Sequence, residues 1–461
     1  MTRICNRRVT LAAGFLILSA AIGGSVFAGE KTSEGILARA QDIVLDMKGN
    51  VYTAGYCADP FAETDFFTVK YDTKGRLQWT ARYDGPAGSS DYASAVAVDD
   101  NGSVYTAGHS NGKKTSLDLT VVKYDAGGRE MWVYRYDGPS HRDDYAESMA
   151  LDPEGNLYVT GYSFGAGTEH DFVTLKLSPN GREIWADRYN APINRDDSAR
   201  ALCLHPDSGI VVTGTDRVRE TSYDFLTFRY GADGRRIWQA RYFSPGKEYD
   251  TARALALGKD GAVYVTGFSY RRAAEYDIVT IKYDPEGNRV WDASYNGPGG
   301  RMDTSCAISV SKEGNVYVAG KSLGKESAFD ICLLKYDAQG REEWAKFYNG
   351  SGNGADAASA LALDPDGNIV LTGYSRGEGT GRDIVLLKYA PDGSLIWETR
   401  YDGPVKGEDR PVSMVLDPGG NIYIGGYSIG EDGTFDCLTI KYGSDGQLQW
   451  VSRWPDMKKS D

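Results

Sequence analysis

The sequence predicts an all-β protein, an eight-bladed β-propeller built from eight 53-residue repeats of four antiparallel strands. The first observation is a tryptophan that recurs every 53 residues with no insertion or deletion between repeats. It stands at eight positions: Trp79, Trp132, Trp185, Trp238, Trp291, Trp344, Trp397 and Trp450. The second observation is that each repeat contains four short apolar segments bounded by Gly, Pro, Asn and Asp, with no helical period. Four strands in about 50 residues are typical of one propeller blade.

The third repeat shows the expected elements in chain order. Strands are predicted at Ala146–Leu151, Leu157–Tyr162, Asp171–Leu177 and Glu183–Tyr189, and turn residues follow the first and the third of them. The first strand carries small residues on one face, which blades converging on an axis require. The third strand is apolar on both faces, as expected when neighbouring blades cover both of them.

Because each repeat runs through all four strands, we expect one repeat per blade. Ring closure would then rest on face packing between the first and last blades. The repeats begin near residues 36, 89, 142, 195, 248, 301, 354 and 407.

Residues 1–28 are predicted to be a signal peptide, ahead of a single propeller domain at 29–461. Three arginines precede the apolar run Leu11–Ala28, which ends in a small-x-small cleavage pattern. The adjacent Arg7 and Arg8 leave a twin-arginine route open, and the length of the apolar run leaves an uncleaved anchor open. We expect a periplasmic, secreted or cell-surface protein with no membrane insertion beyond this segment.

The composition argues against nucleic acid as a partner. The chain has 51 Lys and Arg against 64 Asp and Glu, a formal charge of −13, and no block of basic residues. We expect a monomer with a soluble, acidic surface.

Five cysteines follow the predicted signal peptide, and they occupy five different positions of the repeat. This pattern favours isolated small core residues over a disulfide framework. The pairs Cys306–Cys332 and Cys57–Cys437 remain open as disulfides.

Two motifs carry a resemblance to known families. The segment DDYAESMALDPEGNLYVTGYS (Asp143–Ser163) resembles the bacterial SBBP β-propeller repeat family, and all eight units follow this pattern. The segment KYDPEGNRVW (Lys282–Trp291) is similar to the tryptophan-docking motif of eight-bladed quinoprotein dehydrogenases, in which the Trp wedges between blades. The first resemblance implies an exported or surface propeller. The chain has no adjacent Cys pair and no loop that departs in length, so we expect no quinone cofactor.

Aspartates recur in every repeat at the start of the third strand, and in seven repeats between the fourth strand and the next first strand. Clustered carboxylates suit calcium. A residue needed by every blade more often accepts backbone N–H bonds within loops, and we favour that structural role. No metal site is predicted here.

Histidines depart from the repeat in two places. His205 replaces a turn aspartate on the bottom face, where the first-to-second and third-to-fourth connections lie. His109, His141 and His170 map to the top face of blades 2 and 3, among acidic residues. A metal or catalytic cluster there is one alternative, and solvated loop histidines are the other.

A second departure from the repeat pattern favours a ligand-binding site. Arginines and tyrosines gather on the top face of blades 4 and 5, in an otherwise acidic chain. Arg forks bind carboxylate or phosphate, and Tyr faces suit sugar rings or peptide side chains. The alternative is scattered surface arginine balanced by nearby glutamates. The candidate ligand-binding residues are Arg200, Arg217, Arg219, Arg253, Arg271, Arg272, Tyr223, Tyr249, Tyr270 and Tyr276.

We therefore interpret the chain as an exported, non-catalytic binding or scaffold protein whose top-face loops engage an acidic glycan or protein segment. No catalytic residue is predicted. One alternative is a metal-assisted hydrolase or lyase that uses His109, His141 and His170. A purely structural cell-envelope protein is the other.

Overall fold

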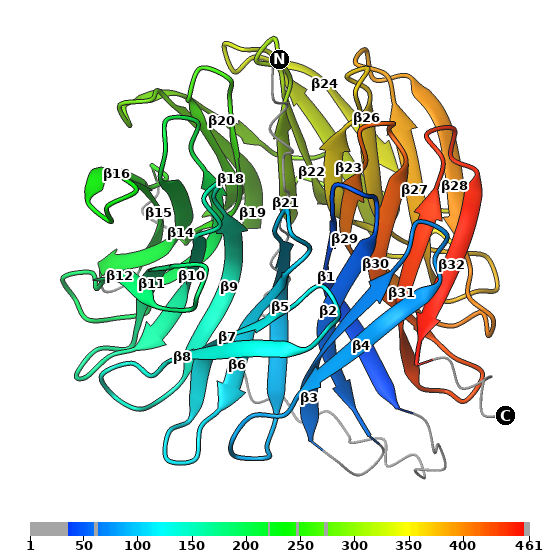
Figure 1. Cartoon of the computed structure of the whole chain (residues 1–461). Helices are drawn as coiled ribbons and strands as arrows, with labels where there is room; N and C mark the ends of the chain where they lie inside the picture. Colours follow the sequence, from blue (N-terminus) through cyan, green and yellow to red (C-terminus); the bar gives the residue numbers. More distant parts are fainter. Residues whose placement is uncertain (1–35, 60–62, 220–221, 246–248, 272–274, 456–461) are drawn as a thin grey trace, which may run out of the picture.

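The computed structural model describes residues 36–59, 63–219, 222–245, 249–271 and 275–455, without the side chain of Arg219. The predicted signal peptide lies outside these ranges. The described chain forms eight four-stranded antiparallel sheets, each made of one repeat, and the sheets stand in a ring (Figure 1). The predicted eight-bladed β-propeller is confirmed, and so is the prediction of one repeat per blade.

We name the four strands of a blade A to D from the axis outward. The A strands of adjacent blades contact one another. The A strands are β1 Leu37–Leu45, β5 Asp91–Val98, β9 Asp144–Leu151, β13 Ser198–Leu204, β17 Asp250–Leu257, β21 Asp303–Val310, β25 Ala357–Leu363 and β29 Asp409–Leu416. The B strands are β2 Val51–Ala58, β6 Val104–Asn111, β10 Leu157–Phe164, β14 Ile210–Arg219, β18 Val263–Arg271, β22 Val316–Leu323, β26 Ile369–Arg376 and β30 Ile422–Ile429.

The C and D strands complete each blade. The C strands are β3 Thr64–Tyr71, β7 Leu117–Tyr124, β11 His170–Leu177, β15 Ser222–Tyr230, β19 Glu275–Tyr283, β23 Phe329–Tyr336, β27 Arg382–Tyr389 and β31 Phe435–Tyr442. The D strands are β4 Leu77–Tyr83, β8 Glu130–Tyr136, β12 Glu183–Tyr189, β16 Arg236–Tyr242, β20 Arg289–Tyr295, β24 Glu342–Tyr348, β28 Leu395–Tyr401 and β32 Leu448–Trp454. In the third repeat the four observed strands extend the predicted ones by two residues at most.

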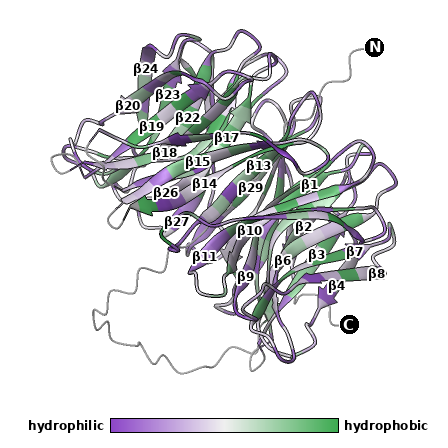
Figure 2. Cartoon of the chain, turned by 90° about the vertical axis from the view of Figure 1, so that its left-hand side faces the viewer, coloured by the Kyte–Doolittle hydropathy of each residue, from purple (hydrophilic) through white to green (hydrophobic). Residues whose placement is uncertain are grey.

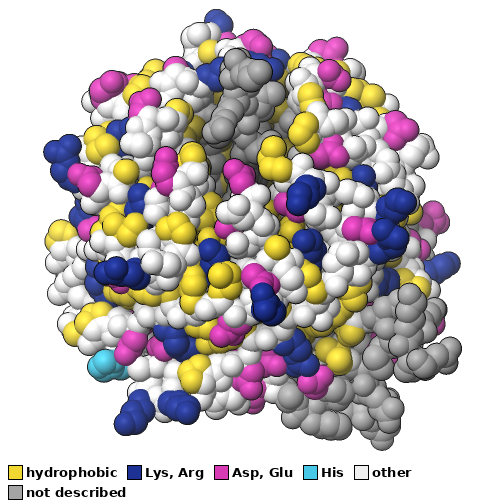
Figure 3. Space-filling view, viewed as in Figure 1, with side chains coloured by type: hydrophobic (Ala, Val, Ile, Leu, Met, Phe, Trp, Pro, Cys, Tyr) yellow, Lys and Arg dark blue, Asp and Glu magenta, His cyan; other side chains and the backbone are white. Residues whose placement is uncertain are grey.

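The hydrophobic core lies between blades rather than within one. One cluster, for example, joins Val121 of blade 2 to Val159, Val173 and Leu175 of blade 3, all of them buried. Figure 2 shows hydrophobic residues concentrated within the strands and mostly hydrophilic residues in the connections. Acidic and basic side chains are interspersed over the face seen in Figure 3.

The recurring tryptophan fixes each blade to the next. The Trp132 indole N–H donates to the carbonyl of Pro179 at 3.3 Å, and its ring lies against the turn glycine Gly181. A Cβ on Gly181 would lie 2.7 Å from that ring, so the contact requires glycine. The hydrogen bond recurs at seven of the eight tryptophans. The Trp397 ring lies against Gly446 in the same way, but its N–H has no hydrogen-bond partner among the described residues.

Blades 8 and 1 close the ring by this docking as well. Trp450 of β32 donates to the carbonyl of Thr73 at 3.2 Å and lies against Gly75. No strand is exchanged between the two sheets. Closure by face packing is confirmed.

The five described cysteines are present as thiols, so neither Cys306–Cys332 nor Cys57–Cys437 is a disulfide. Cys57, Cys332 and Cys437 are fully buried in the core, as small apolar residues are. Among the described residues, no helix is long and apolar enough to cross a membrane.

Candidate functional site

A β-bulge in strand A turns one extra side chain of every blade toward the axis. In β13, Ala199 and Ala201 pair with consecutive residues of β14, and Arg200 between them is left without a pairing partner. A bulge re-aims the extra side chain. All eight A strands carry it, at Gln41, Ser94, Glu147, Arg200, Arg253, Cys306, Ser359 and Val412.

These bulge side chains reach from one A strand to the next around the axis. Ser94 Oγ donates to the carbonyl of Ala146 in the next blade at 2.6 Å, and Cys306 Sγ donates to that of Ala358 at 3.3 Å. One B-strand residue per blade lies beside the bulge, toward the top face. We call the two sets together the axial mouth. The B-strand members are Tyr56, His109, Tyr162, Thr215, Phe268, Lys321, Tyr374 and Tyr427.

Aromatic rings form a continuous row along the axial mouth of blades 1 to 3. Ring centroids are 5.1 Å apart for Tyr56 and Tyr92, 5.4 Å for Tyr92 and His109, and 4.7 Å for His109 and Tyr145. Tyr145 then stacks on Tyr162 at 4.6 Å. All five rings are half-buried. The row offers flat apolar faces with polar edges, which suits sugar rings.

His109 is the one histidine in this row of aromatic rings. Burial lowers its pKa to about 4, and Nδ1 has no hydrogen-bond partner among the described residues. The imidazole is therefore neutral at pH 7 and acts as a ring in the aromatic row rather than as a charge.

Basic side chains occupy the axial mouth of blades 4 to 6. Arg200 Nη1 lies 3.0 Å from Glu147 Oε1, and the guanidinium lies 5.5 Å from the Tyr162 ring. Arg253 lies 5.2 Å from the Phe268 ring, and Lys321 lies 4.4 Å from the Phe329 ring. The axial mouth is thus lined by a row of aromatic rings in blades 1 to 3 and by three cations in blades 4 to 6.

The structure separates the predicted arginines and tyrosines of blades 4 and 5 into two groups. In the first, Arg217 lies 5.2 Å from the Tyr223 ring, which lies 4.9 Å from the Tyr249 ring. The Tyr223 hydroxyl donates to Asp196 Oδ2 at 3.2 Å. Aromatic contacts therefore hold this group in place beside the axial mouth.

The second group continues outward from Arg253. Tyr276 lies 5.2 Å from Phe268 and 5.4 Å from Tyr270, edge to face in both cases. Arg272 lies outside the described residues, as does the side chain of Arg219. Their predicted binding role therefore stays a prediction.

Arg271 contacts the strand C aspartate and the strand D serine of its own blade. Its guanidinium lies 3.2 Å from Asp277 and donates to Ser294 Oγ at 2.9 Å. In six other blades the strand D residue at the Ser294 position is an arginine, and in blade 3 this arginine, Arg188, pairs with the strand C aspartate Asp171 at 2.7 Å. Arg271 therefore takes the place of the arginine that strand D of blade 5 lacks.

We expect Arg271→Ala to lower the free energy of unfolding by about 1–2 kcal/mol, because Asp277 is buried and would lose its counter-charge. Chemical denaturation measures this. The control is Arg301→Ala, which breaks an exposed pair with Glu275 and should cost less than about 0.5 kcal/mol. Equal costs for the two variants would contradict the structural role.

The recurrent aspartates between strands D and A close loops, which agrees with the structural role that the repeat pattern favours. Each of the seven aspartates before or at the start of strand A accepts the backbone N–H of the residue six positions earlier. Gly85 donates to Asp91 at 2.5 Å and Ala191 to Asp197 at 2.6 Å. Burial raises the pKa of Asp144 to about 6 and that of Asp197 to about 7.

Three inter-blade positions bring a third aspartate to within 4.8 Å of the other two. These groups are Asp65, Asp84 and Asp91; Asp118, Asp137 and Asp144; and Asp383, Asp402 and Asp409. An arginine also contacts the strand C member of each group, as Arg135 does Asp118 at 2.8 Å. The guanidinium supplies the positive charge that a cation would otherwise bring.

The three top-face histidines do not come together as metal ligands. His170 Nδ1 lies 2.9 Å from Asp196, whereas the exposed His141 lies 2.6 Å from Asp137. Among the described residues, no group of three potential metal ligands contains a histidine. The histidine-based hydrolase or lyase therefore lacks a preformed three-ligand site.

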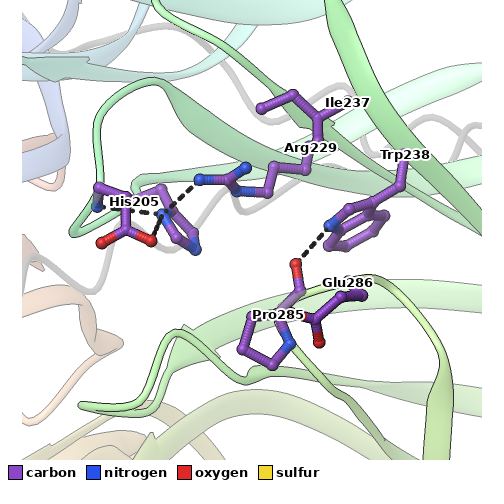
Figure 4. A pocket seen from close by; sticks show the side chains of 7 residues that line it. His205, Arg229, Ile237, Trp238, Pro285 and Glu286 are labelled. Carbon is purple, nitrogen blue, oxygen red and sulfur yellow. Dashed lines mark hydrogen bonds and ion pairs between the residues drawn. The ribbon is translucent and has the colours of Figure 1, made fainter.

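A recess of about 370 Å³ opens on the bottom face between blades 4 and 5 (Figure 4). Arg229 replaces the usual strand C lysine here, and its guanidinium lies 2.9 Å from His205 Nδ1. Burial lowers the pKa of His205, and the charge of Arg229 lowers it further. Trp238, Pro285 and Glu286 line the opposite wall, so this recess mixes apolar and charged groups of both signs.

Two of the predicted residues, Arg200 and Arg253, lie at the axial mouth. The aromatic row, Glu147 and Lys321 were not predicted from the sequence. A signal was present in the repeat register. The bulge position carries a different residue type in almost every blade, while its neighbours stay small, and such variation on a constant frame marks a lined surface.

The class of protein that this geometry defines is an eight-bladed β-propeller whose axial mouth carries an aromatic row in blades 1 to 3 and cations in blades 4 to 6. Residues 78–113 and 136–166 match the SBBP beta-propeller repeat, and residues 365–395 match a beta-propeller domain of unknown function, DUF5122. These matches support the resemblance to SBBP-type β-propeller repeats.

Two curated proteins are similar over part of their length. The uncharacterized WD repeat-containing protein L264 of Acanthamoeba polyphaga mimivirus is 22% identical over 441 residues, covering 83% of this chain and 27% of that protein. The regulatory protein FlaEY of Caulobacter vibrioides is 29% identical over 169 residues, covering 31% of this chain and 17% of that protein. This chain therefore spans only a minor part of either relative.

Solved structures with a similar fold include the periplasmic gluconolactonase PpgL of Pseudomonas aeruginosa, with a TM-score of 0.45, 15% identity and coverage of 76% of this chain and 94% of that chain. The polysaccharide lyase Uly1 has a TM-score of 0.45 and 11% identity, covering 76% of this chain and 90% of that chain. Likeness at this level assigns no activity to this chain.

Proposed function

We propose that this protein is an exported, non-catalytic binding β-propeller whose axial mouth binds an acidic oligosaccharide. The observation that carries the proposal is the division of the axial mouth into a row of aromatic rings and a group of cations. Aromatic faces bind the apolar faces of sugar rings, and cations bind carboxylate or sulfate substituents. An acidic sugar chain carries both features on one molecule.

Because the whole chain is acidic, binding of an acidic polymer depends on this local group of cations. A protein of net charge −13 repels acidic polymers at long range, so binding requires a local positive site. Arg200, Arg253 and Lys321 form such a site on three successive blades. The aromatic row begins beside it at Tyr162, which Arg200 contacts.

Export follows from the predicted signal peptide and belongs to the same proposal. An exported protein would encounter acidic glycans in the form of extracellular and envelope polysaccharides, so the predicted location agrees with the proposed ligand. A rigid ring of eight blades would present the axial mouth to such a polymer with little loss of conformational entropy on binding.

Binding of the purified protein to arrayed acidic and neutral glycans tests the proposal. We expect acidic glycans to be retained, and Tyr145→Ala to weaken their binding about fivefold to tenfold through loss of one aromatic face. The matched control is Phe347→Ala, an exposed ring on the outer strand β24, which should leave binding unchanged.

Four outcomes would overturn this function. Equal binding of neutral and acidic glycans would remove the role of the cations. Binding of acidic peptides but not glycans would replace the oligosaccharide with a protein partner. Absence of binding to either class would favour a purely structural envelope role, and cleavage of a bound glycan would make the protein an enzyme.

A further inference from the structure

Two cations of the axial mouth have no acidic partner. Neither Arg253 nor Lys321 makes a hydrogen bond or an ion pair with any other described residue. Their close contacts are the aromatic rings of Phe268 at 5.2 Å and Phe329 at 4.4 Å. By contrast, Arg200 of the neighbouring blade is paired with Glu147 at 3.0 Å.

The surroundings of Arg253 and Lys321 disfavour the charged forms of both side chains. Burial lowers the pKa of Lys321, and the charge of Arg253 lowers it further. Burial and then the charge of Arg200 likewise lower the pKa of Arg253. The nearby Cys306 offers no compensation, because burial raises the pKa of its thiol to about 12 and it stays neutral. Three cations therefore face one carboxylate, Glu147.

Both side chains are half-buried and lack an ion-pair partner, and an opposite charge from outside the chain would stabilise them. The donors present are suited to an oxyanion: the guanidinium fork of Arg253 can bind two oxygens at once, and the Lys321 ammonium adds a point charge. The hydroxyl of Thr251, two residues from Arg253 in β17, is buried and also has no hydrogen-bond partner among the described residues.

We propose that Arg253 and Lys321 form a subsite for a single oxyanion group, a carboxylate or a sulfate, at the axial mouth between blades 5 and 6. This inference rests on the proposed function and deepens it. It places the acidic substituent of the oligosaccharide on blades 5 and 6, and the sugar rings that follow along the aromatic row of blades 1 to 3.

The test measures binding of sodium glucuronate and of sodium sulfate by calorimetry at constant ionic strength in chloride. Arg253→Gln and Lys321→Gln are each expected to weaken binding tenfold or more. Lys114→Gln, which removes a top-face charge outside the axial mouth, is the matched control and should leave the affinity unchanged. Preference for glucuronate or for sulfate identifies the substituent.

A second readout separates a binding subsite from a structural role. Because both cations are unpaired, Arg253→Gln and Lys321→Gln should raise the melting temperature of the protein without anion, whereas removal of a structural charge lowers it. A lower melting temperature of both variants together with unchanged anion affinity would overturn the proposal. It would also be overturned if the wild type bound neither anion in preference to chloride.

If either variant fails to fold, the wild type still decides the question. NMR titration of the Lys321 amine should show a higher midpoint with sulfate present than with chloride alone, since a bound anion favours the charged form. An unchanged midpoint would overturn the subsite. The proposed glycan function and the proposed subsite can also be overturned separately. If both variants still bind glycans, only the subsite is wrong. If the wild type binds sulfate but no glycan, only the glycan function is wrong.

Discussion

Replacing Gly181 by alanine is expected to lower the free energy of unfolding by roughly 2–5 kcal/mol. Gly181 has φ +80°, which costs an L-residue about 1–2 kcal/mol. The new Cβ would also lie 2.7 Å from the Trp132 ring, so the ring that fixes blade 2 to blade 3 would have to shift. Displacing a packed side chain in this way adds about 1–3 kcal/mol. Urea denaturation gives the value.

The same blade supplies a matched control for the backbone contribution. Gly167, in the B–C connection, has φ +88°, and no atom lies within 4 Å of the position that an alanine methyl group would take there. Gly167→Ala should therefore cost only the backbone part, about 1–2 kcal/mol. If both variants lose the same stability, the tryptophan docking contributes nothing beyond the turn, and its role in joining the blades is wrong.

This docking is also why so much of the fold could be predicted from the sequence. Trp132 and Gly181 are 49 residues apart, and the same spacing separates Trp79 from Gly128. Each pair is one inter-blade contact, so the recurrence predicts the number of blades and the way in which the ring closes. Strand positions followed because a four-strand blade leaves little freedom within 53 residues.

The axial mouth was harder to predict, because its geometry depends on a one-residue bulge. The bulge turns Arg200 toward Glu147, which lies in the preceding blade and 53 residues earlier. Within a single repeat the bulge leaves no mark in the sequence, and only comparison of the repeats shows the variable position. Contacts across blades also depend on how one sheet is rotated against the next. Lys321 was hidden for a different reason, since it stands in a strand that is otherwise apolar core.

The role of Arg271 was predictable in principle. Strand D carries an arginine in six repeats, and the fifth has Ser294 at that position. Aligned with the other repeats, blade 5 lacks the strand D arginine and has an additional arginine at the end of strand B. This comparison of strand D across the repeats predicts a structural contact for Arg271, whereas its neighbourhood of arginines and tyrosines predicts ligand binding.

Stability is expected to rise as the pH falls from about 8 to about 4, through Asp197. This carboxyl group is fully buried and accepts the backbone N–H groups of Ala191 at 2.6 Å and Arg217 at 2.8 Å. Burial raises its pKa to about 7, with the charges of Asp216 and Asp171 contributing, against an ordinary value of 3.8. The folded chain therefore takes up a proton that the unfolded chain releases.

The direction of the pH dependence follows from the difference between the pKa of Asp197 in the folded chain and in the unfolded chain. Stability from Asp197 is fully present below about pH 4 and is lost as the pH rises through about 7. Each pKa unit corresponds to about 1.4 kcal/mol, so the unfolding free energy of the wild type relative to Asp197→Asn should fall by up to roughly 4 kcal/mol across this range. Urea denaturation at a series of pH values measures the difference.

A control of opposite sign makes the result decisive. The backbone N–H of Arg129 lowers the pKa of Asp125, so the advantage of the wild type over Asp125→Asn should shrink as the pH falls. Carboxyl-carbon NMR supplies the direct reading for Asp197, with a midpoint expected near 7. A midpoint near 4 would mean that the two loop N–H groups stabilise the carboxylate enough to offset its burial, and the loop-closing aspartates would then stabilise the propeller as anions at neutral pH.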